Sequence, residues 1–298
     1  MLRIQNWKGE AVLRVGLILF LSVHLGNALA RLYDAGIDLR QIISLPLLSN
    51  AIVMLSACGA MIILFAKDLL SKHPIWSLFL LGLTLVTLTL DSSASLLHEP
   101  AMKGTQTAFP KIVIGSICFQ GAMIGLAIWI SHQHQTRFWE AYGFKNGKPI
   151  KIVAYGALFG LLALVFQTMY VVVTTRFSIE VPEQEVVQII RQTDGFWAKA
   201  YLGFFATVLA PLGEELFFRG MVYPTLRERV GILWGTVISS AIFTLIHFNP
   251  IETFLPLFVL AVSLTLAYEL TSNILASVVA HSIFNLANFI AVNLTKTG

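Results

Sequence analysis

The stretch PLGEELFFRG, residues 211–220, places two acids and one base inside a strongly apolar region. Residues 202–210 before it are almost wholly hydrophobic, and residues 216–218 within it are hydrophobic again. An ionised side chain in such surroundings is strongly destabilising unless it is paired or neutralised. The charges of this stretch therefore need a structural or a functional explanation.

The whole chain is apolar. Of its 298 residues, 56% are hydrophobic and 12% are charged, whereas soluble domains average about 25% charged residues. A soluble fold could bury many apolar residues, but it could not cover this surface with polar ones. The sequence therefore predicts an integral membrane protein in the lipid bilayer. The formal charge of +4 indicates basic cytoplasmic loops and no nucleic-acid partner.

Apolar stretches long enough to cross a bilayer recur along the chain. About 20 mostly apolar residues are needed for one crossing. They predict an all-α fold, a polytopic membrane helical bundle of about nine transmembrane helices, at residues 11–32, 42–66, 75–97, 112–131, 152–175, 198–219, 231–249, 254–270 and 273–294.

A long polar loop divides these spans into two sets. Its residues 183–191 have the pattern of a short amphipathic helix on the membrane surface. We expect three parts, namely an N-terminal membrane region of five helices at 1–175, the polar loop at 176–197 and a four-helix catalytic core at 198–298.

Basic residues favour one orientation in the cell membrane. Lys and Arg are more frequent before the first span and after the second, fourth and sixth spans than in the opposite loops. The segment after the sixth span contributes Arg219, Arg227 and Arg229 to this count. The bias predicts a cytoplasmic N-terminus and an outside C-terminus. Two pairs of small residues, Gly121 with Gly125 and Gly156 with Gly160, predict close helix packing.

The two glutamates of the opening stretch differ in their expected partners. Glu215 and Arg219 are four residues apart with the acid first, which is the favourable order for an ion pair on a helix. Glu214 lies about 100° around the helix from Glu215 and matches Arg219 poorly. Glu215 and Arg219 either support a site or only anchor the end of a span. Glu214 is left over, and intramembrane acids are functional by default.

Two further polar insertions follow in later spans. His247 lies near the end of the seventh span, and His281 and Asn285 lie on one helix face of the ninth. If the chain turns at Val230 and Gly231, both Glu214 and His247 are 16 residues from the turn.

An antiparallel helical pair around that turn would place Glu214 and His247 at one depth, roughly 24 Å from the turn. This requires the sixth helix to continue past Gly220 and Pro224. His281 lies roughly 12 Å from the same side of the membrane. We therefore expect a shared pocket that opens to the cytoplasm.

These residue types suit hydrolysis without a covalent nucleophile. Glu214 can deprotonate a water that His247 holds. His281 and Asn285 supply N–H donors for an oxyanion. The set predicts an endopeptidase that acts on a membrane-associated protein or peptide and needs no cofactor. Glu214, His247 and His281 could also bind Zn²⁺ with one open position, and the spacing does not separate the two mechanisms.

Three motifs together resemble those of a known family, the CPBP intramembrane proteases. This family comprises CAAX proteases and bacteriocin-processing enzymes, is also called the Abi family, and has the type II CAAX prenyl endopeptidases as eukaryotic relatives. The resemblance covers residues 198–290. The matching motifs are, in order, Glu214-Glu215-xxx-Arg219, Phe243-xxx-His247 and His281-xxx-Asn285.

The resemblance implies a helical bundle with a membrane-embedded cavity that faces the cytosol. It implies that Glu214 and His247 activate water, that His281 and Asn285 form the oxyanion hole, and that Glu215 and Arg219 support the site. The family is often labelled metalloprotease, although its better-understood relatives look like glutamate proteases. The family suggests two functions, the processing of prenylated proteins and the processing of small peptides.

Two other functions compete with this one. A membrane transporter or proton-relay protein could use the same Glu, His and Arg residues. It would be expected to show inverted repeats and discontinuous helices in both halves, whereas the polar residues lie in the last four spans only. A non-catalytic membrane adaptor that keeps the fold is the third alternative.

Overall fold

The computed structural model describes residues 108–295 except 180, 182–183 and 248–250, together with eight residues between 11 and 23. The chain divides into two compact units, one of Leu13–Phe119 and one of Met1–Val12 with Gln120–Gly298. All of the candidate site residues belong to the second unit. Most of the first predicted span and all of the second and third lie outside the described residues.

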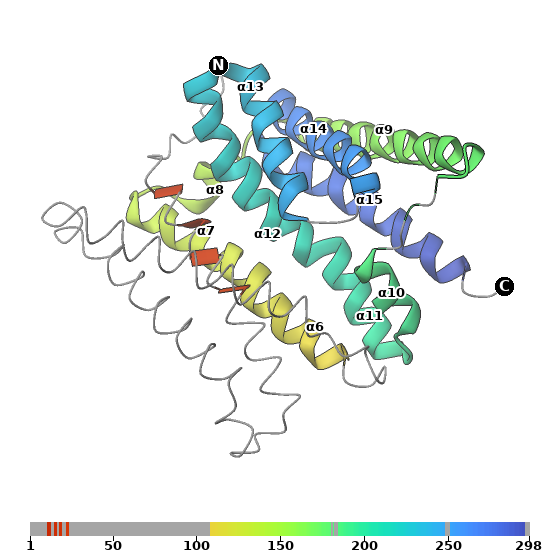
Figure 1. Ribbon diagram of the computed structural model, residues 1–298. Helices are drawn as coiled ribbons and strands as arrows, with labels where there is room; N and C mark the ends of the chain where they lie inside the picture. The colour runs from red at the N-terminus through yellow and green to blue at the C-terminus, as the bar shows by residue number, and fades with distance from the viewer. Residues whose placement is uncertain are drawn as a thin grey trace, which may run out of the picture. The chain divides into compact units, whose positions relative to one another are not determined.

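The described residues form helices joined by short loops, and no strand occurs among them (Figure 1). The elements η1 to η3 are π-helical turns, and η4 is a 3₁₀ turn. In chain order they are α6 (Ala108–Ser116), η1 (Ile117–Gly121), α7 (Ala122–Gln133), α8 (Phe138–Ala141), α9 (Pro149–Arg176), α10 (Glu185–Gln192), α11 (Phe196–Phe204), η2 (Phe205–Leu209), α12 (Ala210–Phe217), η3 (Phe218–Val222), α13 (Tyr223–Ile246), η4 (Ile251–Thr253), α14 (Phe254–Thr271) and α15 (Ile274–Leu294).

Several of these helices are suited to a membrane. Among the described residues, five are long and apolar enough to cross one, namely Ile112–His132, Pro149–Arg176, Phe196–Ile246, Phe254–Thr271 and Ile274–Leu294. The all-helical, membrane-type fold is therefore confirmed for this part of the chain, and the total number of spans stays a prediction. The short helix expected near 183–191 is confirmed as α10.

The longest of these helices combines the sixth and seventh predicted spans. Gly231 interrupts it with φ 80° and ψ 176°, a conformation that suits glycine because it has no Cβ. The two legs of the helix run back along each other (Figure 1). A Cβ on Gly235 would lie 2.9 Å from the backbone nitrogen of Arg227. The predicted turn is confirmed, and residues 220–230 are helical up to it.

Two π turns interrupt the first leg, and each ends two residues before a proline. Pro211 follows η2, and Pro224 follows η3. A proline has no N–H, and its ring collides with the carbonyl four residues earlier in an α-helix. The wider π turn relieves this clash locally. The helix α12, which carries Glu214 and Glu215, lies between the two turns.

Small residues bring α9 against α15. A Cβ on Gly156 would lie 2.8 Å from the carbonyl oxygen of Ala276, and one on Gly160 would lie 2.7 Å from that of Ala280. The predicted packing of this glycine pair is confirmed. At Gly125, in contrast, an added Cβ meets nothing within 4 Å. The division of the chain at 175 and 197 stays a prediction, but α9 packs on the proposed core within one compact unit.

A pair of side-chain amides joins the same two helices further along. Gln167 of α9 and Asn288 of α15 exchange hydrogen bonds of 3.0 and 3.1 Å. The sequence did not predict this pair. An isolated amide in an apolar helix has no pattern that identifies its partner.

The loops of alternate spans gather at one end of this unit. The ring of Tyr142 packs against Gly220 and occupies the space that a Cβ at this position would need. Asn146 donates from Nδ2 to the carbonyl of Ser272 at 2.9 Å, and Asn273 donates to that of Asn146 at 2.7 Å. Such grouping is expected when successive spans alternate in direction. Which end faces the cytoplasm stays a prediction.

Candidate active site

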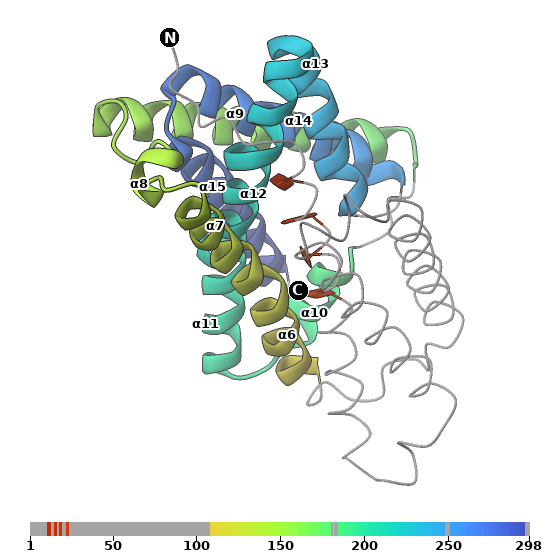
Figure 2. The ribbon, with the colours of Figure 1, turned by 90° about the vertical axis from the view of Figure 1, so that its left-hand side faces the viewer.

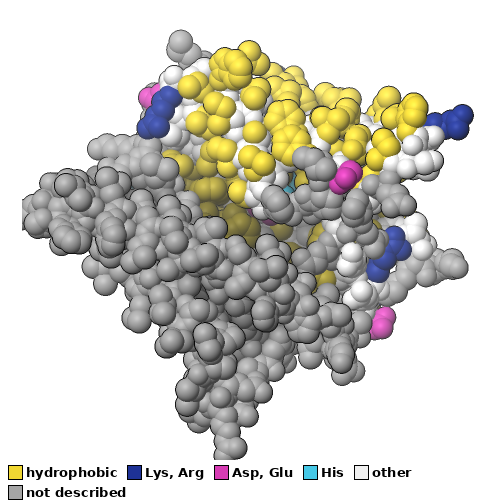
Figure 3. Space-filling model, viewed as in Figure 1, with side chains coloured by type: hydrophobic (Ala, Val, Ile, Leu, Met, Phe, Trp, Pro, Cys, Tyr) yellow, Lys and Arg dark blue, Asp and Glu magenta, His cyan; other side chains and the backbone are white. Residues whose placement is uncertain are grey.

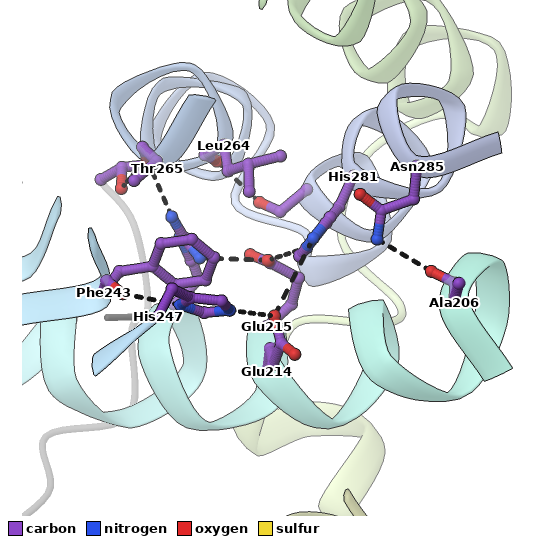
Figure 4. A network of polar contacts seen from close by, with 12 residues as sticks. Ala206, Glu214, Glu215, Phe243, His247, Leu264, Thr265, His281 and Asn285 are labelled. Carbon is purple, nitrogen blue, oxygen red and sulfur yellow. Dashed lines mark hydrogen bonds and ion pairs between the residues drawn. The ribbon is translucent and has the colours of Figure 1, made fainter. Parts of the chain in front are cut away.

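Glu214 lies between two histidine rings that come from different helices (Figure 4). Its Oε2 is 3.5 Å from Nε2 of His247 and 3.9 Å from Nε2 of His281. Glu214 belongs to α12, His247 caps the end of α13 and His281 belongs to α15. The structure thus brings together Glu214, His247 and His281, three of the four residues whose convergence the sequence predicted; the fourth, Asn285, contacts another group.

Two different depths were predicted for the site. Glu214 and His247 were expected roughly 24 Å from the turn, and His281 roughly 12 Å from the same side of the membrane. The turn of the long helix, at the start of the second leg, projects past the neighbouring helices (Figure 2). Near the end of α14, Glu269 accepts hydrogen bonds from Tyr223 at 2.7 Å and from Arg227 at 2.8 Å. The helix α13 continues beyond these contacts to Gly231, so the distance to the turn overstates the depth.

The second glutamate is fully buried in a network of short contacts. Oε1 of Glu215 accepts from Nη1 of Arg219 at 3.0 Å, and Nη2 of Arg219 donates to the carbonyl of Ala261 at 2.9 Å. Both charged side chains have 0% exposure. The predicted ion pair is confirmed. Arg219 is therefore no loop charge, and counting it toward the orientation of the chain was wrong.

Glu215 has a second partner that the sequence analysis missed. Nδ1 of His281 lies 2.8 Å from Oε1 of Glu215, the same oxygen that accepts from Arg219. Residues 215 and 281 are on different helices, so no spacing along the chain reveals the contact. The network thereby fixes the orientation of the His281 ring as well as neutralising Arg219.

Hydrogen-bond partners assign the tautomers of both histidines. The carbonyl of Phe243, which can only accept, lies 2.7 Å from Nδ1 of His247, so this nitrogen carries a hydrogen. Nδ1 of His281 faces the carboxylate of Glu215 and carries one for the same reason. Both Nε2 atoms therefore face Glu214, with a lone pair when the ring is neutral and an N–H when it is charged.

Phe243 organises the site with its ring as well as with its carbonyl. The Arg219 guanidinium carbon lies 4.8 Å from its ring centroid, within the range of a cation–π contact. The centroids of the Phe243 and His247 rings are 4.2 Å apart. Phe243 belongs to one of the three motifs, but the sequence predicted no role for it. Its position four residues before His247 was the signal for a backbone contact within one helix.

Asn285 is placed one turn after His281 on α15, and the structure gives it a partner that the sequence did not predict. Its Nδ2 donates to the carbonyl of Ala206 in the π turn η2 at 2.8 Å (Figure 4). A carboxamide nitrogen carries two hydrogens. One hydrogen of the Asn285 amide is thus bonded to the backbone of the neighbouring helix. This bond also fixes the direction of the second hydrogen, because both are on the same planar group.

Access to the site differs from one side to the other. The side chain of His247 is 29% exposed, that of Glu214 8% and that of His281 5%. The described surface over α13 and α14 is largely apolar with a few charged side chains at its edges, and a small area of histidine is visible (Figure 3). The site is therefore closed at Glu215 and more open at His247.

Comparison with known proteins concerns the segment that carries these residues. Residues 196–287 match the family described as type II CAAX prenyl endopeptidase Rce1-like. UPF0177 protein YxdF of Lactococcus lactis subsp. lactis (strain IL1403) is 32% identical over 91 residues, which are 30% of this chain and 49% of that protein. The match thus spans about half the length of this curated relative. No solved structure matches the chain significantly.

The CPBP resemblance of this segment is thereby confirmed. The sequence left open whether such a CPBP segment holds Zn²⁺. Among the described residues, no three His, Cys, Asp or Glu side chains are placed so that they could hold a metal ion. Ligands at about 2.0–2.1 Å from a tetrahedral zinc lie about 3.4 Å from one another, whereas Nε2 of His281 and Oε2 of Glu214 are 3.9 Å apart. The separation of 3.5 Å between Nε2 of His247 and Oε2 of Glu214 is close to that value. Zinc binding therefore stays a prediction, and no step proposed for this site uses an ion.

Proposed function

We propose that this protein is an intramembrane endopeptidase that hydrolyses a peptide bond of a membrane-associated protein or peptide. The observation that carries the proposal is the position of Glu214 between Nε2 atoms of two oriented histidines, at 3.5 and 3.9 Å. The family match supports a CAAX-type endopeptidase in general. It also favours hydrolysis over a transporter or an adaptor that uses the same residues.

Glu214 is the proposed general base, and His247 is its partner. Their facing atoms are 3.5 Å apart, so a water beside them can contact both groups. The water donates a proton to the Glu214 carboxylate while its oxygen attacks the carbonyl carbon of the peptide bond. Because the Phe243 carbonyl holds Nδ1 of His247, the Nε2 atom stays directed at the water.

The oxyanion that forms on the peptide oxygen needs donors. Nδ1–H of His281 is already committed to Glu215, so His281 donates from Nε2 only when its ring carries both protons. That cation would face two carboxylates, Glu214 and Glu215, with Arg219 as the other positive charge of the network. Two negative and two positive charges then balance. A charged donor stabilises an oxyanion more strongly than a neutral one, and the second N–H of Asn285 completes the pair.

Collapse of the tetrahedral intermediate restores the starting site. The carbon–nitrogen bond breaks, and the departing nitrogen takes the proton that Glu214 received, either directly or through Nε2 of His247. The products are a new carboxylate and a new amine, and the water has supplied the added oxygen and protons. No bond to the protein forms at any stage.

The substrate class follows from the surroundings of the site. An apolar outer surface (Figure 3) and helices suited to a bilayer fit a peptide that is itself bound to the membrane. The name of the matched family adds a prenylated chain end as the first substrate to test. We propose a multi-pass protein of the cell membrane with a cytoplasmic N-terminus and an active site that opens to the cytoplasm.

The test uses the purified full chain in detergent and a fluorescence-quenched peptide that ends in a farnesylated cysteine followed by three residues. The same peptide without the prenyl group is the matched control for substrate class. Cleavage by the wild-type protein is expected, and Glu214→Gln should lower kcat by about 10²- to 10⁴-fold. Its melting temperature should stay unchanged because size and shape are conserved. Retained activity in this variant would reject Glu214 as the base.

A second arm of the same assay addresses the metal. The rate of the wild-type protein is expected to be unchanged after dialysis against a chelator. Loss of activity that added Zn²⁺ restores would reject the metal-free mechanism. Glu214, His247 and His281 would then become ligands, and the observed geometry would have to tighten around the ion.

A further inference from the structure

The carbonyl of Ala206 has lost both of its regular helical donors. In an α-helix it would accept from the N–H of residue 210, and in a π turn from that of residue 211. The N–H of Ala210 bonds instead to the carbonyl of Phe205, and residue 211 is Pro211, which has none. Asn285 fills the vacancy, with its Nδ2 at 2.8 Å from this carbonyl.

The loss arises from the sequence of the helix itself. Without a proline at 211, a N–H at that position would reach the Ala206 carbonyl along the helix and compete with the Asn285 amide for this oxygen. A carboxamide without a fixed partner turns about its terminal torsion, which is broad. A carboxamide tied by one of its two hydrogens has its other N–H held in one direction.

We propose that Pro211 is a positioning residue, which orients Asn285 through the carbonyl that it leaves free. The kinetic part of this inference rests on the function proposed above, while its structural part does not. Pro211 makes no contact with substrate in this scheme. Pro211 lies three residues before Glu214 in the same helix, and it acts through the backbone of η2.

The second π turn provides a matched control within the same helix. Pro224 follows η3 as Pro211 follows η2, and the N–H of Tyr223 bonds to the carbonyl of Phe218. The carbonyl in the equivalent position is that of Arg219, which Asn285 does not contact. Pro224→Ala therefore makes the same chemical change at the same kind of turn without touching the Asn285 hydrogen bond.

A cycle of melting temperatures tests the structural link without any substrate. In the full-length protein in detergent, Asn285→Ala should lower Tm by a few degrees, because the Ala206 carbonyl loses its donor in an apolar setting. In the Pro211→Ala background the same change should have little effect, since residue 211 now supplies a N–H. In the Pro224→Ala background the full drop should return. Equal drops in all backgrounds, or no drop in either proline variant, would overturn the proposal.

The kinetic cycle uses the farnesylated peptide and separates kcat from KM. Pro211→Ala should lower kcat by about 10- to 10²-fold with KM nearly unchanged, since misorienting a catalytic group costs turnover rather than binding. Adding Asn285→Ala should not lower kcat below that of Asn285→Ala alone. A wild-type kcat in Pro211→Ala would overturn the inference, and so would a kcat far below that of Asn285→Ala, which would place the effect at Glu214. If the wild-type protein cleaves neither peptide, the proposed function fails and the melting cycle alone decides whether Pro211 governs Asn285.

Discussion

Two halves of the site are built from adjacent glutamates and yet differ in kind. The inner network consists of Glu215, Arg219, the Ala261 carbonyl and Nδ1 of His281, and its contacts are 2.8 to 3.0 Å long. The outer pair consists of Glu214 and His247, whose facing atoms are 3.5 Å apart. The inner network is fully closed to solvent, while the side chain of His247 is 29% exposed.

The difference shows how two adjacent residues of one helix can have different roles, one structural and one proposed to be catalytic. Glu215 contacts the Arg219 guanidinium of its own helix and Nδ1 of His281 on α15. Glu214, about 100° away on the same helix, faces two histidine nitrogens at 3.5 and 3.9 Å, so no short hydrogen bond ties up its carboxylate. His281 contacts both halves, since one ring nitrogen belongs to the inner network and the other faces Glu214.

The largest effect is expected from a substitution that breaks the inner network. Glu215→Gln keeps the shape of the side chain but leaves the buried Arg219 without a counter-charge. We expect the free energy of unfolding to fall by about 3–5 kcal/mol, as for other buried pairs that lose one partner. Denaturation of the purified variant in detergent measures this. The double variant Glu215→Gln with Arg219→Met should recover much of the loss, and a double variant less stable than Glu215→Gln would contradict the assignment.

A smaller effect, of another type, is expected at the outer pair. His247→Gln removes the partner of Glu214 and should lower kcat by about 10²-fold. Because the side chain is partly exposed and its short hydrogen bond, from Nδ1 to the Phe243 carbonyl, stays within its own helix, the free energy of unfolding should change by about 0.5 kcal/mol or less. The two quantities are measured on one preparation. A loss of stability as large as that of Glu215→Gln would remove the distinction between the two halves.

The last effect concerns the helix that supports both halves, and it is smaller than the loss expected for Glu215→Gln. Gly160→Ala forces α15 away from α9 at Ala280, next to His281, and should destabilise the protein by about 1–3 kcal/mol through overpacking. Gly125→Ala is the matched control, because nothing lies within 4 Å of the added methyl group. It should be neutral or slightly stabilising. Equal effects of the two changes on the unfolding transition would show that the α9–α15 contact does not hold His281 in place.

Features that depend on the sequence along one helix could be predicted well. The turn at Gly231 and the equal distances of Glu214 and His247 from it followed from residue counts. The Glu215–Arg219 pair followed from helical spacing. These properties need only the rise and the twist of an α-helix, so a single sequence contains them.

Features that depend on how one helix is rotated against another could not be predicted. The bond between Glu215 and His281 requires knowledge of the face that α15 turns toward α12. The bond from Asn285 to Ala206 also requires the π turn, whose extra residue shifts the helix by one position. The placement of the first three spans lies outside the described residues, so their number and their role stay predictions.

The close contact of α9 with α15 has a consequence for any attempt to define a minimal active fragment. Similarity to known proteins begins at residue 196. The close packing of Ala276 and Ala280, however, depends on the glycines at 156 and 160, which precede that segment. The segment that is similar to known proteins is therefore shorter than the segment that packs together as one structure. A chimera that transplants residues 196–287 alone would lack the surface on which its histidine-bearing helix rests, and it would have to be given another helix with an equally smooth face.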